Sequence, residues 1–295
     1  MKLAKIFLFS TQLFFFSSSF SQGCSDAGFC TLGPIKTGIA SDSLRNTLKV
    51  GLNYGKADFD ITVIGSYIDY NYKVSEKLNL GTKITYTNQK NANFSAAALS
   101  DIFVFSDYKV ANKTNVNLGF KIPFSDGNLK NNGIALPMDF QPSLGTFDIV
   151  LGVSRKINNF FLALGYQKPL SQNKNNYFKP ISESKYFTTN GFERSSDILL
   201  RGMYVYDISE KITLNGGLLG IYHTTEDRFV DAIGNKNKIK GSDGLTLNLN
   251  LLVNYKINQT NALELSFGSP LIVRESRPDG LTRSMVANLE YKFKF

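Results

Sequence analysis

The chain has 295 residues and a formal net charge of +9, from 33 Lys and Arg against 24 Asp and Glu. These basic residues are scattered rather than clustered, which argues against a nucleic-acid-binding protein. Phe occurs 24 times, Tyr 14 times and Gly 24 times, but Pro only 8 times, a composition typical of a sheet that alternates polar and apolar residues.

The N-terminus has the three parts of a secretory signal peptide. Lys2 and Lys5 precede an apolar run over residues 6–16, and a small polar stretch over 17–22 follows. We therefore predict a signal peptide over 1–22, with a buried N-terminal helix as the alternative. Beyond it, no run of about 18 apolar residues occurs, so no helix is expected to cross a membrane.

Residues 23–43 form a separate N-terminal segment that contains the only two cysteines, Cys24 and Cys30. In an oxidising periplasm such a close pair is expected to form a disulfide. The alternative is a lipid on Cys24, although the preceding Ser21-Gln22-Gly23 lacks the usual apolar residue of a lipidation site. The segment is predicted to lie either in the periplasm or in the lumen of the domain that follows.

Residues 44–295 repeat one unit, an alternating segment followed by a polar connection. The clearest example runs from Leu245 to Ile257, where odd positions are apolar or aromatic and even positions are polar except Leu252. Twelve such strands are predicted, and an even number is what a single-chain barrel requires. They lie near 46–55, 60–74, 78–88, 101–111, 115–124, 145–156, 159–168, 196–208, 211–223, 244–257, 260–269 and 282–295.

The predicted connections alternate in length. Short turns follow strands two, four, six, eight and ten, and longer connections follow strands three, five, seven, nine and eleven. The short first connection, near Asp58, is the exception. This parity is typical of a transmembrane barrel with short periplasmic turns and long external loops, and it is difficult to obtain in a soluble sandwich. We predict an all-β fold, an antiparallel up-and-down transmembrane β-barrel of about twelve strands.

Aromatic residues mark one predicted membrane boundary. Tyr72, Tyr108, Tyr206 and Tyr255 each precede a short turn by the same offset, which predicts an inner aromatic girdle rather than ordinary hairpin chemistry. The chain then ends on an alternating aromatic strand and Phe295, which resembles the signal recognised by the outer-membrane assembly machinery.

The polar parity of the strands is predicted to face the lumen, because charges facing lipid at mid-depth cost about 2–4 kcal/mol. Their mixed signs predict a lumen crossed by ion pairs. Inward glycines are expected to leave lumen space or to allow wall curvature. The lumen-lining candidates are Lys49, Asp69, Lys83, Asp107, Lys121, Asp148, Arg201, Glu264, Glu290 and Lys292; the inward glycines are Gly51, Gly65, Gly81, Gly119, Gly152, Gly165, Gly217 and Gly268.

Enzyme chemistry is not predicted. His223 is the only histidine and no Ser-His-Asp spacing is legible around it, so we interpret it as a residue of the barrel rim. No nucleotide-binding or zinc signature occurs, and no cofactor or metal is expected.

The middle of the chain carries a family resemblance. The stretch Gly119-Phe120-Lys121-Ile122-Pro123-Phe124-Ser125-Asp126-Gly127, followed by Gly145-Thr146-Phe147-Asp148, resembles the outer-membrane barrels of the meta-pathway of phenol degradation. The match covers about a fifth of the chain, and Phe20-Ser21-Gln22 resembles signal-peptide ends of the Bacteroidota. The resemblance implies transport of hydrophobic or aromatic compounds.

Together these features predict a protein of the bacterial outer membrane, reached after export to the periplasm. Its expected partners are outer-membrane lipid, a small-molecule solute and, through Phe295, the assembly machinery; no nucleic acid is expected. The predicted function is a transporter or channel for small solutes. The alternative is a structural or adhesive barrel that binds partners through its external loops.

Overall fold

The computed structural model describes residues 44–180, 185–280 and 283–295. The predicted signal peptide over 1–22 and the segment over 23–43, with Cys24 and Cys30, lie outside the described residues. Within those residues, no helix reaches the length and apolarity needed to cross a membrane.

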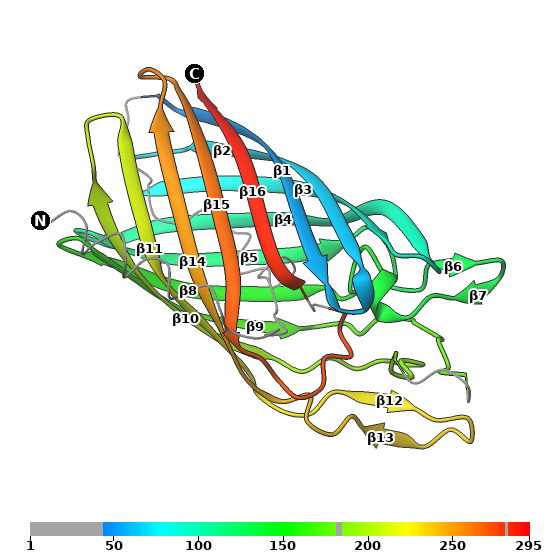
Figure 1. Cartoon of the computed structure of the whole chain (residues 1–295). Coiled ribbons are helices and arrows are strands. Elements are labelled where there is room, and N and C mark those ends of the chain that lie inside the picture. The colour runs from blue at the N-terminus through cyan, green and yellow to red at the C-terminus, as the bar shows by residue number, and fades with distance from the viewer. Residues whose placement is uncertain (1–43, 181–184, 281–282) are drawn as a thin grey trace, which may run out of the picture.

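Twelve antiparallel strands close into one barrel, which confirms the predicted fold class (Figure 1). Neighbours in sequence pair with each other, and the first and last strands close the barrel, for example through Leu52 opposite Leu289. The barrel strands are β1 (Asn46–Ala57), β2 (Thr62–Lys73), β3 (Leu78–Lys90), β4 (Ser95–Ala111), β5 (Thr114–Pro123), β8 (Asp148–Ile157), β9 (Phe160–Pro169), β10 (Asp197–Asp207), β11 (Ile212–His223), β14 (Gly244–Lys256), β15 (Asn261–Ile272) and β16 (Arg283–Lys294).

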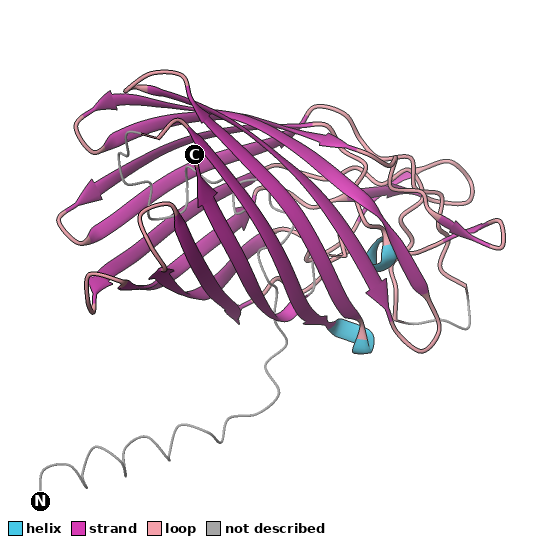
Figure 2. Ribbon diagram, turned by 90° about the horizontal axis from the view of Figure 1, so that it is seen from above, coloured by secondary structure: helices cyan, strands magenta, loops and turns pink. Residues whose placement is uncertain are grey.

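The two ends of the barrel differ. One end, here called the turn end, carries the five short turns and the C-terminus, and the other, the loop end, carries the long connections over 124–147, 170–196, 224–243 and 273–282. Two hairpins extend beyond the loop end, β6 (Lys130–Asn131) with β7 (Ile134–Ala135) and β12 (Arg228–Val230) with β13 (Lys236–Lys238) (Figures 1 and 2). The predicted parity of short turns is therefore confirmed.

The predicted long connection after the third strand is wrong. β4 begins at Ser95, six residues before the predicted start at 101, and leaves only 91–94 as a connection. Residues 95–100 contain three alanines, which have weak strand propensity and hide the alternation. They nevertheless pair with β3, where Ala96 lies opposite Gln89 and Ser95 opposite Lys90.

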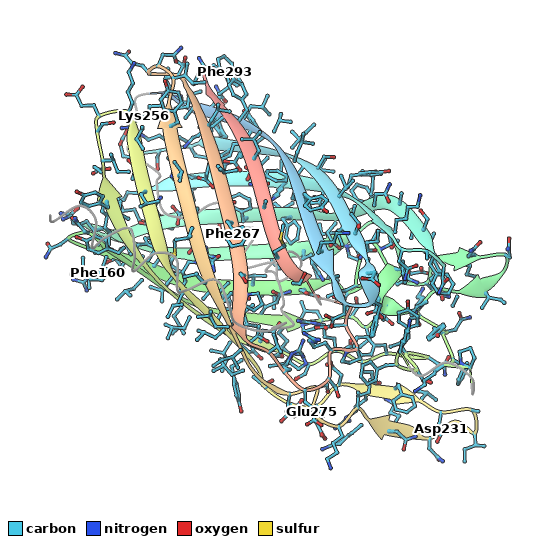
Figure 3. All side chains as sticks on the ribbon, in the orientation of Figure 1. Phe160, Asp231, Lys256, Phe267, Glu275 and Phe293 are labelled. Carbon is cyan, nitrogen blue, oxygen red and sulfur yellow. The ribbon has the colours of Figure 1, made fainter. Side chains whose placement is uncertain are left out.

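Apolar side chains cover the outside of the barrel. Leu52, Leu200 and Leu265 are more than half exposed, while their neighbours along each strand are buried or partly buried. Successive side chains of a strand point to opposite faces of the sheet, so the alternating sequence directly produces an apolar outer face and a more polar inner face. In Figure 3, Phe160 lies on the outer surface, Phe293 near the turn end and Asp231 beyond the loop end.

Exposed aromatic residues form two belts on this surface. The turn-end belt contains the four predicted tyrosines and others; its members are Tyr70, Tyr72, Tyr108, Phe160, Tyr204, Tyr206, Tyr255, Tyr291, Phe293 and Phe295. A loop-end belt that the sequence analysis did not identify contains Tyr54, Tyr86, Tyr166 and Tyr222. Phe160 and Tyr166 lie six residues apart on β9, or roughly 20 Å at about 3.3 Å per residue. Because barrel strands tilt by about 35–45°, this separation corresponds to a height of roughly 15 Å, which fits within the apolar band of outer-membrane barrels, about 25 Å.

The loops at the loop end pack on one another. Two short 3-10 helices, η3 (Asp58–Asp60) and η4 (Met138–Phe140), lie in these connections. Four aromatic rings from four different connections meet edge to face, with Phe59 5.1 Å and Phe140 6.0 Å from Tyr186, and Phe94 5.2 Å from Phe140 between ring centroids. The loop end therefore has an apolar core, which the loops share with Val63 and Ala96 at the ends of β2 and β4.

Candidate lumen wall and loop-end cluster

The ten charged residues singled out from the sequence lie on the parity opposite to the exposed apolar side chains. Eight of them are buried, and Lys49 and Lys292 are partly buried. Because the barrel is closed, that parity points inward.

One group of inward residues joins β16, β1, β2 and β3. Lys49 Nζ lies 3.6 Å from Asp69 Oδ2 and 3.9 Å from Glu290 Oε1. The Tyr67 hydroxyl donates a 2.7 Å hydrogen bond to Glu290, and Lys83 Nζ lies 3.7 Å from the centroid of the Tyr67 ring. Tyr67 was not among the residues predicted to line the lumen, although its parity, which is that of Asp69, was a readable signal. Its position opposite Gly51 follows only from the strand register in the structure.

A second group lies on β5 and β8. Lys121 Nζ is 3.1 Å from Asp148 Oδ2 and donates a 2.9 Å hydrogen bond to Thr146 Oγ1. Gln167 Nε2 donates to the same carboxylate at 2.5 Å. Both charged side chains are completely buried, so the positive charge of Lys121 and the negative charge of Asp148 must compensate each other. Asp107 is not part of either group and accepts hydrogen bonds from Asn115 and Asn117 nearer the turn end.

The inward glycines leave space that other side chains occupy. A Cβ at Gly51 would lie 2.1 Å from Cζ of Tyr67, and one at Gly81 would lie 2.3 Å from Cζ of Phe105. The space that a side chain would take at Gly51 and Gly81 is therefore filled by the rings of Tyr67 and Phe105, which pack against the wall, and it does not widen the lumen. The expectation of open lumen space is wrong at these two positions.

The inner wall combines an apolar cluster with polar side chains. Within the six consecutive strands from β4 to β11, buried apolar side chains form one cluster, here called the apolar strip: Phe103, Phe105, Val150, Ala163, Leu199 and Leu219. The other six strands carry the Tyr67 group and inward asparagines, here called the amide wall: Asn53, Asn248, Asn250 and Asn288.

Asn248 is the most unusual member of the amide wall. It is 2% exposed, and neither its Oδ1 nor its Nδ2 atom has a hydrogen-bond partner within the described part of the chain. Its neighbour across the strand pair is Leu219 of the apolar strip. Leaving a buried donor or acceptor unpaired costs about 1–3 kcal/mol, so the Asn248 amide gains from any water or other molecule that reaches it.

Buried charges from three loops meet the barrel rim at the loop end. His223 Nδ1 lies 2.7 Å from Asp197 Oδ1, and His223 Nε2 lies 2.7 Å from Asp227 Oδ1. Arg194 donates a 2.6 Å hydrogen bond to Asp197. We call the whole set the rim cluster: Arg194, Asp197, His223, Asp227, Ser242, Arg274 and Asp279, each at most 7% exposed.

The rim cluster continues into the last loop. Arg274 donates to Asp279 at 2.9 Å and to the Ser242 carbonyl at 2.6 Å, and Arg194 Nε lies 3.6 Å from Asp279. The backbone N–H of Asp227 donates a 2.8 Å hydrogen bond to Ser242 Oγ. The cluster therefore ties the connections 170–196, 224–243 and 273–282 to the ends of β10 and β11.

Burial and charge oppose each other at these loop residues. Burial lowers the pKa of Arg194, but the carboxylates of Asp197, Asp279 and Asp227 outweigh it and leave the pKa above its ordinary value. Burial raises the pKa of the Asp279 carboxyl, and Arg274 and Arg194 outweigh it and leave that pKa below its ordinary value. Arg194 thus stays cationic and Asp279 stays anionic over the physiological range.

His223 is a rim residue, as interpreted from the sequence, but it is buried rather than open to solvent. Both ring nitrogens already face carboxylates, so neither is left to take a proton from a nucleophile. Among the described residues, no group of three or more Asp, Glu, His or Cys is placed to hold a metal ion. The partners of His223 lie 26 and 4 positions away in sequence, and only the shorter separation was a readable signal.

Solved structures share this architecture. An outer membrane channel from Pseudomonas putida F1 is similar with a TM-score of 0.59 and 12% identity over 87% of this chain and 97% of that one. The chain has the fold of bacterial outer-membrane barrels. The translocator domain of the autotransporter NalP from Neisseria meningitidis is also similar, with a TM-score of 0.52 and 9% identity over 87% of this chain and 90% of that one.

These identities show the fold alone, because a barrel channel and an autotransporter translocator both share it. No family model matches the chain, and no curated protein matches its sequence. The resemblance to the meta-pathway barrels therefore stays a prediction.

Proposed function

We propose that this protein is an outer-membrane channel for small solutes that have an apolar or aromatic part and a polar part. The observation that carries the proposal is that the inner wall presents both an apolar strip and an amide wall. A solute of mixed polarity contacts both surfaces, whereas an inorganic ion gains nothing from the apolar strip. The resemblance of residues 119–148 to meta-pathway barrels supports the same class of solute.

The mixed charges support a selective path rather than a general one. Lys49, Asp69 and Glu290 compensate one another, as do Lys121 and Asp148, so the wall has no single sign that attracts all anions or all cations. We propose that these charged residues line the path and that Asn248 hydrogen-bonds to the polar part of the solute.

Uptake into proteoliposomes tests the proposal. We expect phenylalanine to enter faster than glutamine, a polar amino acid of similar length, and we expect Leu199→Ala to reduce that preference. Leu200→Ala is the matched control, because Leu200 is the next residue of β10 but points outward and is 61% exposed. Equal uptake of both amino acids, or an equal effect of both variants, would contradict the proposal.

A structural or adhesive role is the second candidate. Four connections pack together over the loop end, and the hairpin tips expose Ile134 by 72% and Ile233 by 83%. Single exposed isoleucines on projecting hairpins suit contact with a partner surface. No flux above empty liposomes, for either amino acid and with the barrel folded, would favour this candidate.

Localisation and assembly belong to the same proposal. Export through the segment 1–22, a disulfide between Cys24 and Cys30, and recognition of Phe295 by the assembly machinery are all expected of an outer-membrane barrel. The Phe295 backbone pairs with Asn46 through two 3.0 Å hydrogen bonds, so the terminal residue also completes closure of the barrel. Deleting Phe295 is expected to reduce the folded fraction in isolated outer membranes.

A further inference from the structure

The protonation state of His223 follows from its two hydrogen bonds. An ionised carboxylate only accepts hydrogen bonds, and a neutral imidazole has a single N–H to donate. Asp197 and Asp227 face opposite nitrogens at 2.7 Å each, so both bonds form together only when the ring carries two protons and a positive charge. The ring would otherwise present a lone pair to one carboxylate.

A charge count within the rim cluster gives the same answer. Its cations are Arg194, Arg274 and His223, and its anions are Asp197, Asp227 and Asp279. The two sets match in number when His223 is cationic. A neutral His223 leaves one buried negative charge uncompensated, which is costly in a region closed to water.

A further buried carboxyl close to the rim cluster is that of Asp139 in η4, which Asp279 influences. Burial, together with the charges of Asp279 and Asp58, raises its pKa to about 7, so it is protonated at mildly acidic pH. Asp139 therefore adds no charge to the count at such a pH, and its ionisation at higher pH adds a second buried negative charge.

We propose that the rim cluster is a proton-operated latch that holds the connection 224–243 against the barrel rim while His223 is cationic and releases it when His223 loses its proton. Asp227 is the movable partner, because it lies in that connection, whereas Asp197 and His223 belong to β10 and β11. Release carries Asp227 into water and removes the uncompensated charge. The β12–β13 hairpin moves with it.

The latch regulates the channel proposed above, and in that respect it rests on the proposed function. The connection 224–243 joins β11 to β14 at the loop end, and its β12–β13 hairpin extends beyond the barrel (Figure 1). Its release at higher pH widens the entrance, and its closure at lower pH narrows it. Because an unpaired buried charge costs several times the thermal energy, we expect the ratio of closed to open molecules to change by about tenfold or more.

Two substitutions have opposite expected effects. His223→Gln leaves the cluster with an excess negative charge at every pH, so the loop is expected to be released even at pH 5.5. Asp227→Asn removes one anion, so a neutral His223 donates to Asp197 and accepts from Asn, and the loop is expected to stay closed even at pH 8.5. Glu226→Gln is the matched control, because Glu226 is adjacent but pairs with Lys238 outside the cluster.

Spin labels on the hairpin tips report the loop position without relying on transport. Cysteines replace Ile233 and Ile134, both highly exposed, in a background where Cys24 and Cys30 are serine. Double electron–electron resonance is expected to give a distance distribution that changes between pH 5.5 and 8.5 in the parent and in Glu226→Gln, but not in the other two variants. A distribution independent of pH in the parent, or the same change in all four proteins, would overturn the latch.

Potassium chloride conductance in planar bilayers separates the two proposals. If both hold, conductance of the parent rises about tenfold with pH, while His223→Gln conducts at both values and Asp227→Asn at neither. If the distances respond to pH but no variant conducts, the latch stands and the channel fails. If the protein conducts but the distances and conductance ignore pH in every variant, the channel stands and the latch fails.

Discussion

Lys121 Nζ and Asp148 Oδ2 lie 3.1 Å apart inside the barrel, and both side chains are completely buried. The two residues sit opposite each other on β5 and β8, within the stretch that resembles the meta-pathway barrels. Because neither side chain reaches solvent, the charge of each residue can be buried only while the charge of the other compensates it.

Removing one partner of this pair is expected to destabilise the barrel strongly. Lys121→Met leaves Asp148 buried without a counter-charge, at an expected cost of about 3–5 kcal/mol. The double variant Lys121→Met/Asp148→Leu is expected to recover most of that loss. The measurement is the free energy of unfolding in detergent, followed in urea. If Lys121→Met were as stable as the double variant, the charges of Lys121 and Asp148 would not be compensating each other.

Inward glycines are expected to differ in their tolerance of a methyl group. Gly51→Ala places a Cβ against the Tyr67 ring and displaces that ring from Glu290, at an expected cost of about 1–3 kcal/mol. Gly268→Ala is the control, because its Cβ would meet only the Leu249 carbonyl, at 3.9 Å. The temperature at which half of the protein loses its faster gel mobility measures the stability of each variant. Equal temperatures for the two variants would mean that the space at Gly51 does not hold Tyr67 in place.

Depth in the membrane is expected to set the cost of an outward charge. Leu218 lies four residues from Tyr222 of the loop-end belt and is opposite Gly202, so it falls near the middle of the apolar band. Leu218→Arg is expected to cost about 2–4 kcal/mol in lipid vesicles, and Tyr222→Arg about 0–1 kcal/mol. Reversible unfolding in vesicles measures both. Equal costs would contradict a bilayer centred between the two aromatic belts.

Packing of the loop end is expected to weaken as pH rises, because the pKa of Asp139 is raised to about 7. Between its ordinary value near 4 and about 7, folded Asp139 retains a proton that the unfolded chain releases, so the stabilisation is complete below pH 4 and is lost as pH approaches and passes 7. Thermal unfolding from pH 4 to 8 in the Asp227→Asn background isolates this effect from the latch.

Asp139→Asn is the variant that checks the cause. Its amide does not ionise, so the slope of stability against pH over this range should disappear, and the variant should be the more stable one above pH 7. An unchanged slope would assign the pH dependence to another group.

The strands were predictable because their signal is local. Leu245 to Ile257 alternates along a single segment, and the structure places β14 over nearly the same residues. The start of β4 was not predictable, because alanines over 96–98 carry no polarity contrast and only pairing with β3 defines them. The loop-end aromatic belt was missed for a related reason, since no repeated turn motif marks its tyrosines.

The lumen groups show where sequence reasoning stops. The parity of a strand placed Lys49, Asp69 and Glu290 on one face, but the contact of Glu290 with Tyr67 spans 223 positions and depends on closure between β1 and β16. The placement of His223 at the rim was readable, whereas its bonds to Asp197 and Asp227 required the loops to fold over it.

The sequence by itself determined the barrel: which residues form strands, which face of each strand is apolar, and at which end the long connections lie. These properties follow from a period of two residues and from turn chemistry, both of which act over a few positions. Only the tertiary structure decided which inward charges pair, which rings cover Gly51 and Gly81, and how three loops share the rim cluster. Those contacts join residues far apart in the chain, and closure of the sheet together with packing of the loops brings them within bonding distance.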